Sequence, residues 1–387
     1  MKIIAFYLPQ FHDIPENDKW WGKGFTEWVN VKKAQPLFPG HCQPRVPLNE
    51  NYYDLLDDDV KIWQANIAKE HGVYGFCYYH YWFSGKMLLE KPMEQMLANK
   101  KVDIPFCICW ANVSWTKSWV NENKILIQQF YGDRKEWKEH FDYMLPFFKD
   151  DRYIKEEGKP LFVLYRPETV EHLNEMLDYW DELAKQNGFA GIKYAYQNIT
   201  FDLMKNKDDS RFDYNIEFQP SYAWNDMNNS TALQTSKGWN FLRNAKRSTF
   251  AWIEKKFGIN PYNYLAHTGK EEKSTVTITS YDDAWNAILS HNPADEKCVP
   301  GAFVSWDNTP RKVHRGQVYV GDTPEKFKKY LSQQIRRARE VYHKDMIFMY
   351  AWNEWAEGGY LEPDERYGYK NLEAIRDALK ENNEFPW

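Results

Sequence analysis

Eight short apolar segments recur along this chain of 387 residues. Most of them are apolar at consecutive positions, a pattern typical of parallel strands that are covered on both faces. They span residues 3–9, 73–82, 104–111, 160–166, 192–198, 214–220, 301–308 and 346–353. Helical patterns lie between most of them or after the last, at residues 59–71, 90–99, 134–148, 168–187, 323–342 and 369–381. Strands that alternate with helices in this way predict an α/β fold, the (β/α)8 or TIM barrel.

The length exceeds the roughly 250 residues of a typical barrel of this class, so we expect insertions in the loops. The longest loops are residues 10–55 after the first strand and residues 221–292 after the sixth. The second loop is polar, and we expect a helix in it near residues 240–257. No linker or low-complexity tract divides the chain, which predicts a single domain over residues 1–387.

Aromatic residues make up 17% of the chain, yet its mean hydropathy is −0.76. Trp and Tyr combine an apolar face with a hydrogen-bonding group, so many of them suit pockets that have one wet side. A sugar is one ligand class that fits such pockets, because its ring has an apolar C–H face and a hydroxyl edge. Packing in a large core is the other explanation, and burial statistics favour it for about half of these side chains.

The net charge and the hydropathy of the chain argue against binding to nucleic acid and against a membrane-spanning helix. The net charge is −5, which argues against nucleic-acid binding, because nucleic-acid-binding proteins carry a basic excess. No run of 18 or more apolar residues occurs, so we expect no membrane-spanning helix. The N-terminal apolar stretch is too short for a signal peptide and no small-residue cleavage site follows it. This favours a cytoplasmic protein, although a secreted or periplasmic chain trimmed of its signal would look similar.

In a (β/α)8 barrel the active site lies at the carboxyl ends of the strands. The predicted strands therefore identify a set of residues that converge on one face of the barrel. This set is polar and aromatic with few cations, which suits a neutral, hydroxyl-rich ligand such as an oligosaccharide or polysaccharide. Its members include Tyr7, Gln10, His80, Tyr81, Trp110, Asn112, Gln219, Trp306, Asp307, Trp352 and Asn353. For His80 a buried structural histidine, and for Asp307 a turn-forming aspartate, is the competing explanation.

The segment Trp-Asn-Glu-Trp-Ala-Glu-Gly-Gly at residues 352–359 carries the strongest sign of chemistry. An apolar strand runs directly into Glu354 and Glu357, which share one face only if the chain turns helically after the strand. The strand must therefore end at or before Glu354. Two carboxyl groups that flank a scissile bond are the usual tool of glycoside hydrolysis, one protonated and the other charged. The competing explanation, two solvent-facing acids in a surface loop, is disfavoured by their position after the eighth strand and between tryptophans.

Two further aromatic motifs fit a sugar pocket. In the loop after the first strand, Glu27 beside Trp28 could bind sugar hydroxyls, or the loop could simply bury its tryptophans. In the segment at residues 78–82, alternation places Tyr79 and Tyr81 on one face of the strand and their neighbours on the other. Periodicity does not decide which of the two faces points into the barrel.

The sequence shows no cofactor motif. It has no GxGxxG, Walker or HExxH pattern, and its histidines lack metal-ligand spacing. Asp57 and Asp59 resemble the Asp-x-Asp with which many sugar transferases hold a metal, but they directly precede a predicted helix, so capping explains them better. Cys107 and Cys109 lie in an apolar run, where buried structural thiols are expected rather than a metal site. We therefore expect neither a metal nor a cofactor.

Six stretches together resemble the WbsX-like proteins, which are related to glycoside hydrolase family 99. They span nearly the whole chain: AFYLPQFH at 5–12, WGKGFTEW at 21–28, LFPG at 37–40, LEKP at 89–92, WDNTPR at 306–311 and WNEWAEG at 352–358. The tie to the characterised family-99 enzymes rests mostly on the last stretch. Those enzymes are (β/α)8 endo-acting α-mannosidases and mannanases that retain configuration and need no metal.

The resemblance implies roles for the two glutamates. Glu354 would be the base that takes the proton from the sugar 2-hydroxyl and so forms a 1,2-anhydro intermediate. Glu357 would be the acid that protonates the leaving oxygen and then the base for water. This chain departs from the family-99 pattern at Ala356, where His is common, and from an Asn-Glu-Asn-Trp pattern of WbsX-like relatives at residues 113–114. Both departures concern sugar specificity more than the chemistry.

The sequence therefore predicts a retaining glycoside hydrolase that acts on an α-linked, mannose-type or related glycan, and the resemblance favours endo action. Two other functions stay open. One is a glycosyltransferase of surface-polysaccharide (O-antigen or capsule) biosynthesis, since WbsX-like proteins occur with such pathways. The other is a glycan-binding barrel without turnover.

Overall fold

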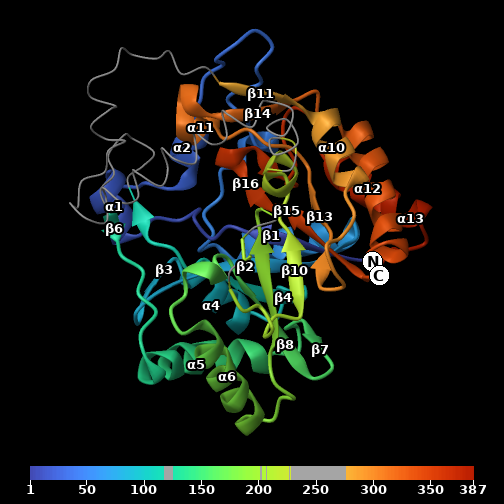
Figure 1. Cartoon of the computed structure of the whole chain (residues 1–387). Helices are drawn as coiled ribbons and strands as arrows, with labels where there is room; N and C mark the ends of the chain where they lie inside the picture. The colour runs from blue at the N-terminus through green and yellow to red at the C-terminus, as the bar shows by residue number, and fades with distance from the viewer. Residues whose placement is uncertain (117–124, 201–202, 206, 226, 228–275) are drawn as a thin grey trace, which may run out of the picture.

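The computed structural model describes residues 1–116, 125–200, 203–205, 207–225, 227 and 276–387 (Figure 1), and the helix expected near residues 240–257 lies outside them. A parallel sheet forms the centre of the fold. Its strands pair in the order β12-β10-β9-β8-β4-β2-β1-β15-β13. In chain order their bounds are β1 (Lys2–Tyr7), β2 (Val73–Phe83), β4 (Phe106–Trp110), β8 (Lys159–Leu164), β9 (Lys193–Asn198), β10 (Tyr214–Glu217), β12 (Cys298–Val299), β13 (Gly301–Phe303) and β15 (Met346–Tyr350).

The two ends of this sheet belong to one stretch of chain, so the sheet closes. β12 pairs with β10 and β13 pairs with β15, and only Pro300 separates β12 from β13. Proline has no N–H to donate, but the carbonyl of Pro300 still accepts a hydrogen bond from the backbone N of Phe348 at 3.2 Å. β12 and β13 therefore act together as the seventh of eight strands. The predicted (β/α)8 fold is confirmed.

Helices surround the barrel between most pairs of strands (Figure 1). Thr323 begins α12 as expected, because its side chain accepts a hydrogen bond from the backbone N of Lys326 at 3.3 Å. Among the described residues between β9 and β10, no helix covers the barrel. The surrounding helices are α3 (Asp58–Glu70), α4 (Lys91–Ala98), α5 (Arg134–Lys149), α6 (Leu173–Gln186), α10 (Tyr281–Ser290), α12 (Pro324–Glu340) and α13 (Lys370–Glu381).

The segment at residues 221–292 needs a correction, because its last part is not inserted. α10 lies within it and is the helix that connects the sixth strand to the seventh. Trp285 of α10 is fully buried and stacks on Phe303 of β13, with ring centroids 5.5 Å apart. This helix was not predicted from the sequence, although Ser280 caps it by accepting a hydrogen bond from the backbone N of Asp283 at 3.2 Å.

Short elements build the loops at both ends of the barrel. The loop after β1 holds α1 (Pro15–Trp21), α2 (Glu27–Lys33) and the 3-10 turn η1 (Leu48–Glu50). Three small sheets pair β5 (Trp115–Thr116) with β6 (Ile125–Ile127), β11 (Thr277–Ser280) with β14 (Gln317–Val320), and β16 (Asn353–Glu354) with β17 (Gly359–Tyr360). The remaining elements are β3 (Lys86–Leu88), β7 (Lys155–Glu156), η3 (Pro167–Thr169), α11 (Thr309–Lys312), η4 (Val313–Arg315) and η5 (Trp355–Glu357).

The contacts of β2 show which of its two faces points into the barrel. Tyr79 stacks on Phe6 of β1 with ring centroids 5.6 Å apart, and Phe6 also contacts Phe218 across the barrel at 5.4 Å. On the other face, His80 Nε2 lies 3.0 Å from His140 Nε2 of α5. Tyr79 therefore points into the barrel and His80 into the layer between sheet and helices.

The described residues give two further findings that bear on the expected class of protein. Cys107 and Cys109 are fully buried free thiols, as expected for structural cysteines. No helix in the ranges given above is long and apolar enough to cross a bilayer. The N-terminal amino group lies 2.6 Å from Glu384 Oε2, so the two chain ends lie side by side (Figure 1).

Candidate active site

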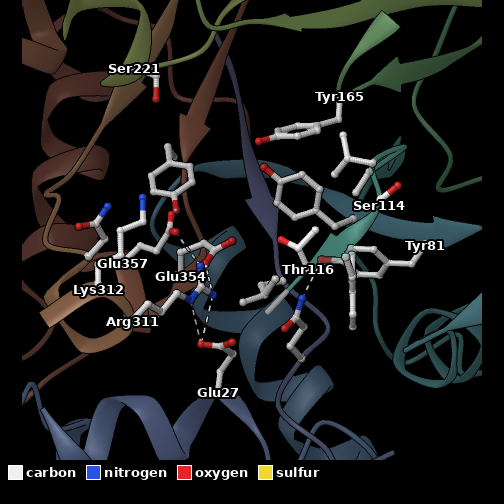
Figure 2. Close-up of a pocket in the computed structure, with 18 of the residues that line it drawn as sticks. Glu27, Tyr81, Ser114, Thr116, Tyr165, Ser221, Arg311, Lys312, Glu354 and Glu357 are labelled. Atoms are coloured by element: carbon white, nitrogen blue, oxygen red, sulfur yellow. Dashed lines mark hydrogen bonds and ion pairs between the residues drawn. The ribbon is translucent and has the colours of Figure 1, made fainter. Parts of the chain in front are cut away.

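A pocket of about 550 Å³ opens at the carboxyl ends of the barrel strands. Residues at or after the end of each of the eight strands contribute to its wall, and Figure 2 shows many of them converging on one hollow. This volume lies within the range of small-molecule sites. Its aromatic wall is formed by Trp21, Phe25, Tyr79, Tyr81, Trp115, Tyr165, Phe218, Trp306 and Tyr350.

Glu354 and Glu357 both line the pocket because the chain turns sharply after the eighth strand. β16 ends at Glu354, and the 3-10 turn η5 carries the chain to Glu357. Gly358 follows with a φ of 65°, and a Cβ there would lie 2.8 Å from the backbone N of Asp307. Only glycine fits both the left-handed backbone and this close approach. The condition that the strand end at or before Glu354 is thus met.

Arg311 joins three carboxylates at the floor of the pocket (Figure 2). Its Nη2 lies 3.2 Å from Glu354 Oε2 and 3.1 Å from Glu27 Oε2, and its Nη1 lies 2.7 Å from Glu357 Oε1. The hydroxyl of Tyr350 donates a hydrogen bond to the other oxygen of Glu357, Oε2. Both candidate catalytic acids therefore contact one guanidinium, which holds them within reach of the same small ligand.

The electrostatics of this cluster follow from burial and charge number. Burial raises the pKa of Glu354 to about 8, Arg311 opposes this rise, and the charges of Glu357 and Glu27 add to it. One guanidinium cannot neutralise three carboxylates. A proton kept on Glu354 therefore lowers the repulsion among the three acidic side chains. Burial would lower the pKa of Arg311, but the three carboxylates outweigh it and keep the guanidinium charged.

Glu27 has one oxygen engaged and one open. Its Oε2 contacts Arg311, while its Oε1 is buried and finds no hydrogen-bond partner in the described structure. Thr26 begins α2 by accepting a hydrogen bond from the backbone N of Trp28 at 3.3 Å, which places Glu27 in the first turn of that helix. A buried carboxylate oxygen is costly unless a donor reaches it. A ligand hydroxyl in the pocket could be that donor.

The structure brings seven of the sixteen predicted site residues to the pocket wall. Gln10 and Tyr81 lie on one side and are joined by a hydrogen bond from Gln10 Nε2 to the Tyr81 hydroxyl at 3.0 Å. The full set is Gln10, Glu27, Tyr79, Tyr81, Trp306, Glu354 and Glu357.

Four of the other nine predicted residues face the helices instead of the pocket, because successive side chains of a strand point to opposite faces of the sheet. Tyr7 donates a hydrogen bond to Gln64 of α3 at 2.7 Å. His80 pairs with His140 of α5, as described above, and is the buried histidine of the competing explanation. Trp110 also contacts the His140 ring, at 4.8 Å, and Trp352 packs on Phe76 at 4.8 Å.

The remaining five are held in contacts that fix loops. Trp28 Nε1 donates to the Tyr53 carbonyl at 2.8 Å. The side chains of Asn112, Asn353 and Gln219 bind the backbones of Arg166, Leu8 and Ala223 respectively. None of these five lines the pocket.

Asp307, the fifth, is a buried anchor for the loop that carries Arg311. It accepts hydrogen bonds from Gln43 Nε2 at 2.7 Å and Thr309 Oγ1 at 2.6 Å, and His41 Nε2 lies 2.8 Å away. Burial would raise the pKa of Asp307, but the His41 contact and the charge of Arg45 hold it below its ordinary value. A charged, fully enclosed carboxylate here fixes the start of the loop.

Most of the other pocket residues were not predicted from the sequence, among them Arg311, Tyr350 and Trp115. Arg311 is part of the WDNTPR motif, but its partner Glu27 lies 284 residues away in the sequence. Two buried acids need a nearby cation, so a search for an arginine in the motifs of the sequence could have pointed to Arg311.

In the same described ranges, His, Cys, Asp and Glu side chains form no group of three or more suited to a metal ion.

Comparison with known sequences matches residues 3–375 to the family described as Glycosyltransferase WbsX. Two curated relatives from Xanthomonas campestris pv. campestris, strains B100 and ATCC 33913, are both named Uncharacterized protein WxcX. Each is 35% identical over 380 residues, which is 97% of this chain and 49% of the relative. The chain therefore spans about half the length of these relatives.

Solved structures similar to this chain include the GH99 endo-α-mannosidase from Bacteroides thetaiotaomicron, with a TM-score of 0.52 and 14% identity over 98% of this chain and 97% of that one. The same enzyme in complex with bis-tris propane gives a TM-score of 0.53 at 13% identity, covering 99% and 97%. A glycoside hydrolase-like protein gives 0.55 at 11%, covering 97% and 93%. These identities show a shared fold only. The sequence match over nearly the whole length shows that the chain belongs to the WbsX glycosyltransferase family.

Proposed function

We propose that this chain is a retaining glycoside hydrolase that cleaves an α-linked, mannose-type or related glycan, with Glu354 and Glu357 as its catalytic pair. The observation that carries the proposal is the contact of one guanidinium, Arg311, with both carboxylates in a pocket of about 550 Å³. The aromatic wall suits the apolar faces of sugar rings. The likeness in fold to structures named as endo-α-mannosidases adds support.

The proposed reaction follows the roles that the family resemblance implies. Glu354 takes the proton from the sugar 2-hydroxyl as that oxygen attacks C1, and Glu357 gives its proton to the departing glycosidic oxygen. The product of this step is a 1,2-anhydro sugar. Glu357 then takes a proton from water, the water oxygen attacks C1, and Glu354 returns its proton to O2. Two inversions at C1 leave the configuration retained.

The protonation state of Glu354 bears on which glutamate is the base. With its pKa raised to about 8, Glu354 carries a proton at neutral pH, and a base must be free of one. Glu354 can serve as the base only if the bound substrate lowers its pKa, for example through hydrogen bonds from sugar hydroxyls to the carboxylate. If it does not, the roles of the two glutamates are reversed.

The test uses Glu354→Gln and Glu357→Gln with two substrates, an α-linked mannan and an α-manno-oligosaccharide that carries a dinitrophenyl leaving group at its reducing end. We expect either change to lower turnover of the mannan by roughly 10³-fold, as is typical for a lost acid or base. The dinitrophenyl group leaves without a proton, so it restores turnover only to the variant that lacks the acid. We expect that variant to be Glu357→Gln.

Near-normal turnover of the mannan by either variant would remove that residue from the pair. Rescue of Glu354→Gln instead of Glu357→Gln would keep the pair and reverse the roles. Glu365→Gln serves as the control, because Glu365 lies outside the pocket in the same region of the chain.

The name of the family favours one other function, transfer from an activated sugar donor. A transferase would bind a nucleotide sugar. Thermal shift with GDP-mannose and with a mannose-type imino sugar separates the two functions, because the protonated imino sugar mimics the charge of a glycosidase transition state. Stabilisation by the imino sugar alone supports the hydrolase, and stabilisation by GDP-mannose alone supports the transferase.

A further inference from the structure

A second hollow of about 750 Å³ adjoins the pocket that holds the two glutamates. The two hollows share Val113 and Ser114 in their linings, so they lie next to each other at the loop after β4. The second hollow is formed by this loop, by the chain that follows β6 and by residues after β8. Its other lining residues are Gln128, Gln129, Phe130, Tyr131, Gly132, Thr169 and Glu171.

The lining of the second hollow has the chemistry of a sugar-binding surface. Phe130 is 62% exposed, which is unusual for so large an apolar side chain, and Tyr131 follows it. An exposed ring can stack on the C–H face of a sugar. The side-chain amide of Gln128 supplies hydrogen-bonding groups in the same wall.

Gln129 adds an independent observation. It is only 5% exposed, and its side-chain oxygen Oε1 is buried without a hydrogen-bond partner within the described ranges. The other end of the same amide is satisfied, because Nε2 donates to the Phe130 carbonyl at 2.6 Å. A buried acceptor without a donor costs free energy. A hydroxyl of a ligand in this hollow would remove that cost.

The wall of the second hollow is held rigidly before any ligand arrives. The backbone N of Gln129 donates to Ser114 Oγ at 2.9 Å, which ties the shared loop to the far wall. The hydroxyl of Tyr131 donates to the Asn112 carbonyl at 3.0 Å, and Trp137 Nε1 donates to the Tyr131 carbonyl at 2.6 Å. A preformed wall loses little entropy when it binds.

We propose that the second hollow is a subsite for a further sugar unit of the same glycan that occupies the catalytic pocket. The inference rests on the proposed function and specifies its substrate class. A chain of sugars fills both hollows across Ser114, so the enzyme takes an extended oligosaccharide or polysaccharide rather than a small glycoside. Phe130 provides the stacking surface and Gln129 Oε1 accepts a hydroxyl.

The experiment measures binding without turnover. Protein carrying Glu357→Gln runs through native gels that contain an α-linked mannan or dextran, and the retardation gives a dissociation constant. Phe130→Ala and Gln129→Met are added separately to this background. Trp387→Ala is the control, because Trp387 is a 48% exposed aromatic residue that lines neither hollow. Thermal melting of each variant verifies that it is folded.

We expect at least one polysaccharide to retard the Glu357→Gln protein. Phe130→Ala should weaken this binding at least threefold, Gln129→Met should weaken it by a smaller factor, and Trp387→Ala should leave it unchanged. Unchanged binding by folded Phe130→Ala and Gln129→Met would overturn the subsite while leaving the proposed function intact. No retardation of the Glu357→Gln protein in any gel would overturn both.

Discussion

Arg311 supplies the positive charge that offsets the carboxylates of the pocket. Its guanidinium contacts Glu27, Glu354 and Glu357, and its side chain is only 8% exposed. A buried ion pair gains little net stability when it forms, but removing one partner leaves the other charged and poorly solvated. Here one removal would leave three carboxylates together. They would respond by holding protons to higher pH.

Arg311→Met is therefore expected to lower kcat on the order of 100-fold, the low end of what acid–base catalysis contributes. It should also move the pH dependence of kcat/KM toward alkaline pH, because the lost cation no longer favours ionised carboxylates. Arg311→Lys should restore part of the profile. Arg315→Met is the control, since Arg315 is exposed and lies outside the pocket. A lower kcat with an unmoved pH profile would assign Arg311 a purely structural role.

The hydroxyl-binding role proposed for Glu27 can be tested separately from its charge. Glu27→Gln keeps an amide oxygen toward Arg311 but replaces the open acceptor Oε1 with an NH2 donor, and it removes one negative charge beside Arg311. We expect KM for glycan to rise several-fold with little change in kcat, because substrate contacts are weakened while both catalytic acids stay bound to Arg311. Steady-state kinetics checks this, and a loss confined to kcat would contradict it.

At the scale of elements, the sequence analysis was most reliable where local pattern decides the outcome. Apolar runs located all eight barrel strands, because strands covered on both faces need apolar residues at consecutive positions. Thr323 marked the start of α12 because capping is a local hydrogen bond. The orientation of Tyr79 and His80 could not be predicted, because alternation defines two faces without saying which one meets the barrel interior. Arg311 escaped notice because its contacts depend on how distant loops fold together.

The start of α3 gives a prediction about the Asp-x-Asp motif. Asp57 accepts a hydrogen bond from the backbone N of Asp59 at 2.9 Å and so caps the helix. Asp57→Ala should lower the free energy of unfolding by about 1 kcal/mol, the usual value of an N-cap. Turnover of glycan and its insensitivity to EDTA should not change.

Asp59→Ala is the matched control, because Asp59 uses only its backbone N in this contact. It should leave stability nearly unchanged. The metal-binding interpretation of the motif requires the opposite pattern, in which both variants lose a metal-stimulated transferase activity and Asp57→Ala melts at the same temperature as the parent protein.

At the scale of the whole molecule, two sets of buried ionisable groups have opposite effects on stability between pH 4.5 and pH 8. Burial raises the pKa of Glu354 and Glu217 to about 8 and that of Glu362 to about 7. Burial lowers the pKa of His80 to about 3, and that of His140 falls as well. The carboxyls keep protons in the folded state that the unfolded chain has lost, and the histidines reject protons that the unfolded chain accepts.

The sign of each effect follows from this difference in bound protons. The carboxyls make stability fall as pH rises from the ordinary value of 4.5 toward 8. The histidines make stability fall as pH drops below their ordinary value of 6.5. Between 4.5 and 6.5 the two sets oppose each other. Above 6.5 the contribution of the histidines fades and the carboxyls dominate, so we expect the melting temperature to fall between pH 6.5 and pH 8.

Glu362→Gln should reduce this fall. Glu362 Oε2 accepts hydrogen bonds from Trp355 Nε1 at 2.6 Å and the Tyr53 hydroxyl at 2.8 Å, and its Oε1 accepts from Gln64 Nε2 at 2.7 Å. In the variant the amide oxygen keeps the first two donors without the cost of a buried charge, while the contact with Gln64 is lost at every pH. The melting temperature of the variant relative to the parent should therefore rise as pH increases from 6.5 to 8. Glu70→Gln, at an exposed glutamate on α3, should show no such trend. A melting temperature of the parent protein that is flat or rises over this range would show that these carboxyls are ionised in the folded state.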